Sequence, residues 1–146
     1  MPDDPLNTEE IDYALENQVG FLLRVASQRH ATIFQTHTNG NLTATQFSTI
    51  IRLAEVGKVS QNQLGRLAAM DVATIKGVVD RLKVKGLIVS EPDLVDKRRA
   101  VISLSARGAA MVSELKKAGL KISAETLAPL NTKEQKTLLT LLNKIS

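Results

Sequence analysis

Apolar residues recur at spacings of three and four along most of the chain, and this period predicts a mainly helical protein. The first helix is expected to begin near Asn7, because Asn7 and Glu10 have the spacing of a capping box. The apolar pattern continues through Ile33, so this helix is expected to end near His37. The next residues, Thr38-Asn39-Gly40-Asn41, form a strong helix-breaking cluster.

Cap residues predict five further helices. Thr43, Ser60 and Asn131 each stand three residues before a glutamine or glutamate, as in a capping box, and Asp71 is an N-cap candidate. A fifth helix is predicted to begin at Ser105. The expected ends are Gly57, Ala68, Gly86, Gly119 and Ile145.

Between the helix that ends at Gly86 and the one that begins at Ser105, the pattern favours strands. Leu87-Ile88-Val89 is short and β-branched, and Ala100-Val101-Ile102-Ser103-Leu104 forms a second predicted strand. Residues 91–99 between them form a charged hairpin, and Val59 is placed to add a one-pair strand. The expected fold is mainly α (α+β), with four helices, two strands and two helices in order.

The two short helices around Met70-Asp71 have the proportions of a helix-turn-helix. In such a unit the second helix enters the major groove of DNA and reads base edges. Its inward face is predicted to be Ile75, Val78, Val79 and Leu82. Its outward face is Ala73, Thr74, Lys76, Gly77, Asp80, Arg81 and Lys83. An ordinary solvated helix would carry similar residues, so this face alone does not decide between the two interpretations.

The basic hairpin that follows favours DNA binding. Lys97, Arg98 and Arg99 stand at its tip, where the wing of a winged helix would carry an arginine into the narrow minor groove. The net charge is +4, with basic residues gathered over 76–107 and acidic residues over 3–16. DNA would therefore be steered toward the basic stretch.

Other classes of function are disfavoured. The chain has no cysteine, which excludes thiolate metal sites and thiol redox sensing within it. It has only two histidines and neither a Gly-rich phosphate loop nor a Gly-x-Ser-x-Gly elbow, so we expect no enzyme and no cofactor. The acidic start Met1-Pro2-Asp3-Asp4 and the lack of a long apolar run predict a cytoplasmic protein without a membrane partner.

Three segments carry a family resemblance: Gly86-Leu87-Ile88-Val89, Asp93-Leu94-Val95-Asp96-Lys97-Arg98-Arg99 and Ile102-Ser103-Leu104-Ser105-Ala106-Arg107-Gly108. Their order resembles the wing and following helix of the MarR family of bacterial winged helix-turn-helix transcriptional regulators. The resemblance covers roughly residues 40–110. Leu94 departs from it, because the family usually has proline there.

The resemblance implies a homodimeric repressor on a palindromic operator. Residues 39–119 would form the winged helix-turn-helix region, and residues 1–38 and 120–146 the dimerisation helices. Arg98 would be the minor-groove arginine, positioned by a salt bridge from Asp96. The full expected DNA-binding set is Ser60, Gln61, Ala73, Thr74, Lys76, Gly77, Arg81, Lys97, Arg98 and Arg99.

The resemblance also implies a small ligand, often aromatic or phenolic and in some cases a carboxylate, that binds between the dimer helices and the reading head and releases DNA. The candidate contacts are Arg24, Arg29, His30, Phe34 and Phe47. Metal sensing through His30 and His37 is less favoured, because no close set of ligands accompanies them. The alternative function is a winged helix that only docks other proteins.

Overall fold

The computed structural model describes residues 10–146. A 3-10 turn, η1 (Leu15–Asn17), is followed by α1 (Val19–Thr38), α2 (Ala44–Val56), β1 (Val59–Ser60), α3 (Gln61–Leu67), α4 (Val72–Val84), β2 (Ile88–Pro92), β3 (Ala100–Leu104), α5 (Ala106–Leu127) and α6 (Thr132–Ile145). The predicted winged helix-turn-helix fold with flanking helices is thereby confirmed. No helix in residues 10–146 is long and apolar enough to cross a membrane.

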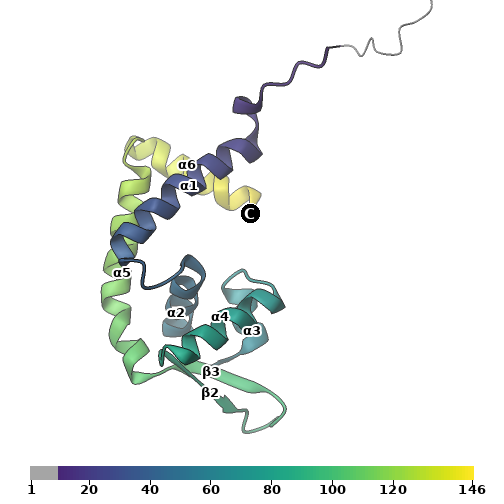
Figure 1. Cartoon of the computed structure of the whole chain (residues 1–146), viewed down its shortest axis with the longest axis vertical. Helices are drawn as coiled ribbons and strands as arrows, with labels where there is room; N and C mark the ends of the chain where they lie inside the picture. Colours follow the sequence, from purple (N-terminus) through teal and green to yellow (C-terminus); the bar gives the residue numbers. More distant parts are fainter. Residues whose placement is uncertain (1–9) are drawn as a thin grey trace, which may run out of the picture.

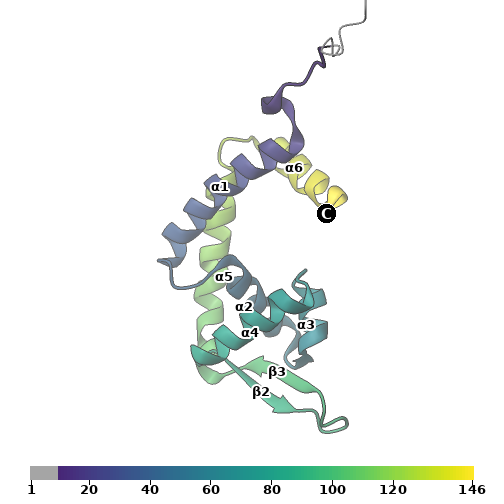
Figure 2. The ribbon, with the colours of Figure 1, turned by 45° about the vertical axis from the view of Figure 1, so that its right-hand side comes forward.

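The elements form two parts, which we call the lobe and the arm. The lobe contains α2, α3, α4 and the sheet, and the arm contains α1, α5 and α6 (Figure 1). Helix α5 runs from the lobe into the arm, where α1 packs beside it, as the turned view also shows (Figure 2). The two parts therefore share one long helix.

The predicted caps explain where most helices begin. The capping boxes at Thr43 and Asn131 form in full. In each, the cap side chain accepts from the N–H of the residue three positions on, and that residue's side chain accepts from the cap N–H. Ser60 forms only half of its box: its Oγ accepts from the Gln63 N–H at 3.2 Å. The Gln63 side chain instead accepts from the guanidinium of Arg66.

The start of the first helix was predicted wrongly. Asn7 lies outside the described residues, but residues 10–14 are not helical and α1 begins only at Val19. Ile11 and Leu15 are exposed, so no packing within the chain compensates for the cost of starting a helix there. The end agrees with the prediction, because Asn39 adopts the left-handed conformation (φ 54°) directly after Thr38.

The end of the fifth helix was also predicted wrongly, since α5 continues past Gly119 to Leu127. Gly119 has a packing role instead. A Cβ at this position would lie 3.1 Å from Cζ of Phe47, so the missing side chain lets α2 approach α5. A glycine inside a helix can thus serve close packing as well as termination.

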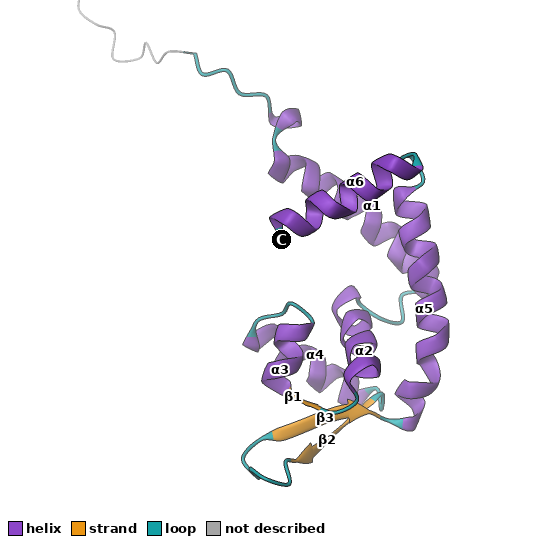
Figure 3. Ribbon diagram, turned by 180° about the vertical axis from the view of Figure 1, so that it is seen from behind, coloured by secondary structure: helices purple, strands orange, loops and turns teal. Residues whose placement is uncertain are grey.

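The sheet is antiparallel, with strand order β1-β3-β2 (Figure 3). Ile88 pairs with Leu104 and Pro92 with Ala100, while the short β1 pairs Val59 with Ile102. Strand β2 begins one residue later than predicted and extends through Pro92. Leu87 is excluded because its N–H donates to the Leu82 carbonyl at 3.0 Å and closes the end of α4.

Two apolar cores hold the protein together. The larger lies in the lobe and includes the fully buried Ile50, Leu64, Ile75, Val79, Leu82 and Ile102. The smaller lies in the arm and consists of Ile33, Phe34 and Ile122. Phe47 packs against both cores and meets the Phe34 ring edge to face, with ring centroids 5.6 Å apart. It is therefore a direct apolar link between lobe and arm.

Candidate nucleic-acid interface

The turn between α3 and α4 brings these helices close together. Ala69 has a positive φ of 56°, and the Met70 N–H donates to the Gly65 carbonyl at 2.8 Å, which closes α3 in a tight turn. A Cβ on the buried Gly65 would lie 3.1 Å from Cγ2 of Ile75. Glycine at this position therefore permits the close helix crossing of the helix-turn-helix.

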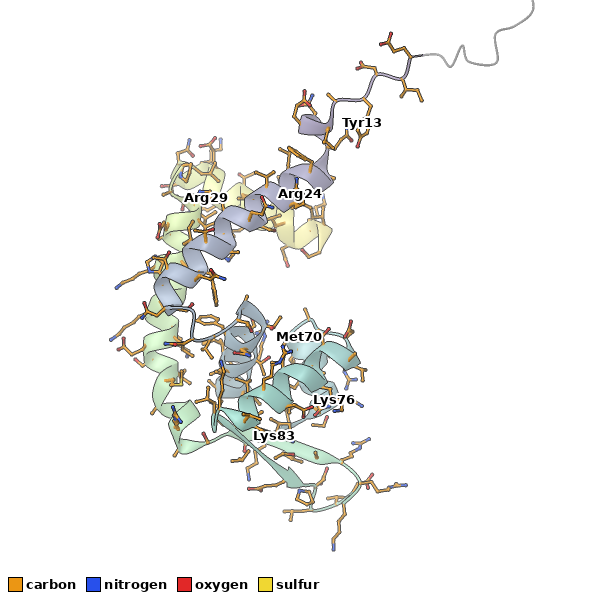
Figure 4. The ribbon with its side chains drawn as sticks, in the orientation of Figure 1. Tyr13, Arg24, Arg29, Met70, Lys76 and Lys83 are labelled. Atoms are coloured by element: carbon orange, nitrogen blue, oxygen red, sulfur yellow. The ribbon has the colours of Figure 1, made fainter. Side chains whose placement is uncertain are left out.

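Helix α4 presents the predicted outward residues to solvent. Ile75, Val78, Val79 and Leu82 are buried, as expected. Ala73, Thr74, Lys76 and Arg81 are exposed, and Gly77 is half-buried. Figure 4 shows Lys76 and Lys83 along α4 and Met70 in the turn before it.

Two acidic side chains shape α4. Asp71 caps the helix: its Oδ1 accepts from the Thr74 N–H at 2.7 Å, and hydrogen bonds from the Thr74 side chain and then its backbone lower the pKa of Asp71. Lys76 and Asp80 form an exposed ion pair of 3.1 Å. An exposed pair of this kind contributes little to stability, so a phosphate can compete for Lys76.

The wing loop, residues 93–99, is closed by its own backbone and by two aspartates. The Asp93 N–H donates to the Arg99 carbonyl at 2.9 Å. Asp93 Oδ1 accepts from the Val95 N–H at 2.9 Å, and Asp96 Oδ1 accepts from the Arg98 N–H at 3.1 Å. These turns form with Leu94 in place of the family's usual proline, and its side chain is 98% exposed.

Asp96 holds Arg98 in a defined position. Arg98 Nε donates to Asp96 Oδ1 at 3.1 Å, while the Arg98 side chain stays 92% exposed. Hydrogen bonds from the Arg98 side chain, and then from its backbone, lower the pKa of Asp96. The Arg98 guanidinium is thus accessible to a partner from solvent, while the hydrogen bond at Nε restrains its position.

The wing and the start of α3 share one polar cavity of about 390 Å³. Its lining brings together the predicted residues Ser60, Gln61, Arg98 and Arg99. Asn62 and Arg66 also line it, and the sequence analysis missed both. Their spacing of four on α3 puts them on one helix face, and this signal could have identified them.

The expected ligand-binding residues do not form one site in the described chain. Arg29 donates to the carbonyls of Thr126 and Glu125 at 2.7 and 3.0 Å, and His30 Nδ1 lies 2.8 Å from Thr126 Oγ1. Both therefore hold α1 against the C-terminal end of α5, where the positive charge of Arg29 is favourable. Arg24 lies over the Phe21 ring, 5.4 Å from its centroid.

Phe47 lines a cavity between α2 and the end of α3. This cavity measures about 360 Å³, and it is lined by Phe47, Ser48, Ile51, Arg52, Leu67, Ala68 and Ala69. Of the two histidines of the metal hypothesis, His37 lies 2.6 Å from a Glu125 carboxylate oxygen, while His30 contacts Thr126. No group of three potential metal ligands gathers in the part of the chain that the structure describes.

Comparison with known proteins gives consistent matches. The model of the MarR family matches residues 42–100. The HTH-type transcriptional repressor NicR of Pseudomonas putida is 39% identical over 91% of this chain and 85% of its own length. A probable transcriptional regulator from Pseudomonas aeruginosa is 47% identical, with a TM-score of 0.87, over 91% of this chain and all of that one. BpsR of Bordetella bronchiseptica, whose DNA binding is regulated by 6-hydroxynicotinic acid, is 35% identical with the same TM-score, over 92% of this chain and 97% of its own.

Proposed function

Because this chain belongs to the MarR family of transcriptional regulators, we propose that it represses transcription as a homodimer on a palindromic operator and is released by a small aromatic ligand. Its family membership confirms the resemblance carried by the wing. It also confirms that the protein is a transcriptional regulator, like its relatives, and not an enzyme. The operator, the dimer and the ligand are the proposed parts.

The observation that carries the DNA-binding proposal is the exposed but restrained Arg98. A side chain that enters the minor groove must be free of the protein surface, and its restraint by Asp96 reduces the entropy lost on binding. The cavity shared by Arg98, Arg99 and Arg66 lies between wing and α3, where a phosphate of the same duplex would be met. We propose that the whole predicted set contacts DNA, from Ser60 and Gln61 through the outward residues of α4 to Lys97, Arg98 and Arg99.

The affinity for DNA is expected to depend steeply on salt. If the interface neutralises about six phosphates, counterion release lowers affinity by about 10³-fold between about 50 mM and about 200 mM salt. A mobility-shift titration with the DNA upstream of the protein's own coding sequence measures this. The absence of any shift at low salt would contradict DNA binding and favour a winged helix that docks proteins.

The dimer proposal is supported by the apolar side chains that the arm exposes. No residue of α6 is buried, although Leu138, Leu139, Leu141 and Ile145 recur at helical spacing. On α1, Val19 and Leu22 are likewise exposed. A second copy related by twofold symmetry would cover these faces and place two α4 helices on the two halves of a palindrome. Residues 1–38 and 120–146 are thus proposed as dimerisation segments and residues 39–119 as the DNA-binding region.

The ligand proposal is supported by the cavity beside Phe47 and by the ligand-regulated relative. The cavity offers an aromatic ring, apolar walls and the guanidinium of Arg52, which donates to the Leu67 carbonyl at 2.8 Å and forms an exposed ion pair with Glu55 at 2.9 Å, for which a ligand carboxylate would compete. These groups suit an aromatic ring that carries a carboxylate. BpsR responds to a compound of this class. Contacts from Arg24, Arg29, His30 and Phe34 stay predictions.

Filling this cavity is expected to remove the response to ligand. In Ser48→Trp the indole would occupy the space beside Phe47, so 6-hydroxynicotinic acid should release wild-type protein from DNA but not the variant. The matched control is Ser113→Trp on the exposed face of α5. Fluorescence anisotropy with labelled operator measures both. Equal release of Ser48→Trp and wild type would exclude the cavity, and no release of wild type would exclude this ligand.

A further inference from the structure

The lobe is joined to α1 and α5 through two connections, and both reach the end of α4. One connection is the loop 39–43 between α1 and α2, and the other is Ser105, directly before α5. Helix α4 ends at Val84, with Lys85 as its C-cap. Both chain connections between lobe and arm therefore lie at the C-terminal end of α4.

The first connection is made by the side chain of Lys85. Its Nζ donates to the Asn41 carbonyl at 2.6 Å and to Gln46 Oε1 at 2.9 Å. Gln46 is buried, and its Oε1 also accepts from the Thr43 N–H at 3.3 Å, which is part of the capping box that starts α2. The ammonium thus links α4 to the loop that leaves α1 and to the first turn of α2. Hydrogen bonds from a charged donor are stronger than neutral ones.

The second connection is made by the first turn of α5. Ser105 Oγ donates to the Gly86 carbonyl at 2.6 Å, and the Ser105 N–H donates to the Leu87 carbonyl at 3.0 Å. A Cβ on Gly108 would lie 2.0 Å from the same Leu87 oxygen. The backbone directly after α4 therefore lies in van der Waals contact with α5, and a tilt of α5 must move it.

Lys85 differs from the other lysines near α4 in what it binds. Lys76 pairs with a carboxylate on its own helix. Neither Lys83 nor Lys85 forms an ion pair with any residue from 10 to 146, but Lys85 alone of these three donates hydrogen bonds to other elements. Both of its acceptors are neutral, and both belong to segments at the junction with α1. Its charge is directed toward the arm side of the lobe rather than to a partner on the surface of α4.

We propose that Lys85 is a positioning residue, whose ammonium fixes the orientation of α4 relative to the arm and so transmits the arrangement of the arm helices to DNA affinity. The proposal rests on the proposed DNA-binding function. It does not place Lys85 in contact with DNA. A contact with phosphate would act through charge, whereas a positioning role acts through the geometry of α4.

The test compares Lys85→Met, which keeps an unbranched side chain one atom shorter but loses the ammonium, with Lys85→Arg, which keeps a charged donor. The control is Lys116→Met, which removes one charge from an exposed position on α5. The DNA is a duplex that the wild-type protein enriches from a random-sequence library, and an unrelated duplex of equal length serves as the non-specific probe. Affinities are measured at several salt concentrations, and circular dichroism checks folding.

Lys85→Met is expected to bind the selected duplex about 2- to 30-fold more weakly, with the salt slope and the affinity for the unrelated duplex equal to those of Lys116→Met. Lys85→Arg should restore binding. If Lys85→Met does not fold, Lys85→Ala repeats the comparison. A salt slope that falls by about one would make Lys85 a phosphate contact and overturn the proposal, as would wild-type affinity in Lys85→Met. If the wild-type protein enriches no duplex, the proposed DNA-binding function itself fails. This outcome is separate from a failure of the Lys85 proposal, because the enrichment uses no variant.

Discussion

The double variant Leu141→Asp/Ile145→Asp is expected to be monomeric and to bind operator DNA about 10²–10⁴-fold more weakly than wild type. Leu141 and Ile145 share one face of α6, and 52% and 66% of their surfaces are exposed in the single chain. A second copy that covers this face would have to bury two carboxylates, which is strongly unfavourable without a partner. The monomer would then bind one half-site without the effective concentration that the second supplies.

Analytical ultracentrifugation gives the oligomeric state of this variant, and a mobility shift gives its affinity. The control is Val56→Asp, which places a single carboxylate on an exposed apolar position of α2, outside the arm. It is expected to remain a dimer with nearly normal affinity. If the α6 variant stayed dimeric, the interface would have to lie elsewhere on the arm.

Arg98→Ala is expected to weaken operator binding by about 1–3 kcal/mol and to leave the dimer intact. The Arg98 side chain is exposed on the wing, so its removal would take away the proposed minor-groove contact without disturbing a core. Asp96→Ala should produce a smaller loss of the same kind. This variant keeps the Arg98 cation but removes Asp96 Oδ1, which accepts hydrogen bonds from both the Nε and the backbone N–H of Arg98 at 3.1 Å.

Isothermal titration or anisotropy at one fixed salt concentration measures both wing variants, with Lys116→Ala as the control for loss of one positive charge. The control is expected to bind nearly as wild type. Unchanged affinity of Arg98→Ala would remove the wing from the mechanism. An equal loss in Arg98→Ala and Lys116→Ala would reduce the role of Arg98 to general charge.

Most of the secondary structure could be predicted from the sequence because its signals are local. Asp71 caps α4 as expected, and the four apolar residues of its inner face are buried together. The wing could also be predicted, since Asp96 and Arg98 are two residues apart and their contact depends only on the turn between them. The errors fell where packing decides. Ile11 has no core residue to pack against before α1, and Gly119 accommodates Phe47 rather than ending α5.

The sequence by itself determined the helix order, the outward face of α4 and the family resemblance carried by the wing. The tertiary structure alone decided which distant residues meet. It brought Arg66, Arg98 and Arg99 to one cavity, bound Arg29 and His30 to the C-terminal end of α5, and joined Lys85 to Asn41. The physical reason is the range of the interactions. Caps and turns form between residues a few positions apart, whereas these contacts join segments up to 97 residues apart, whose proximity depends on the packing of the whole chain.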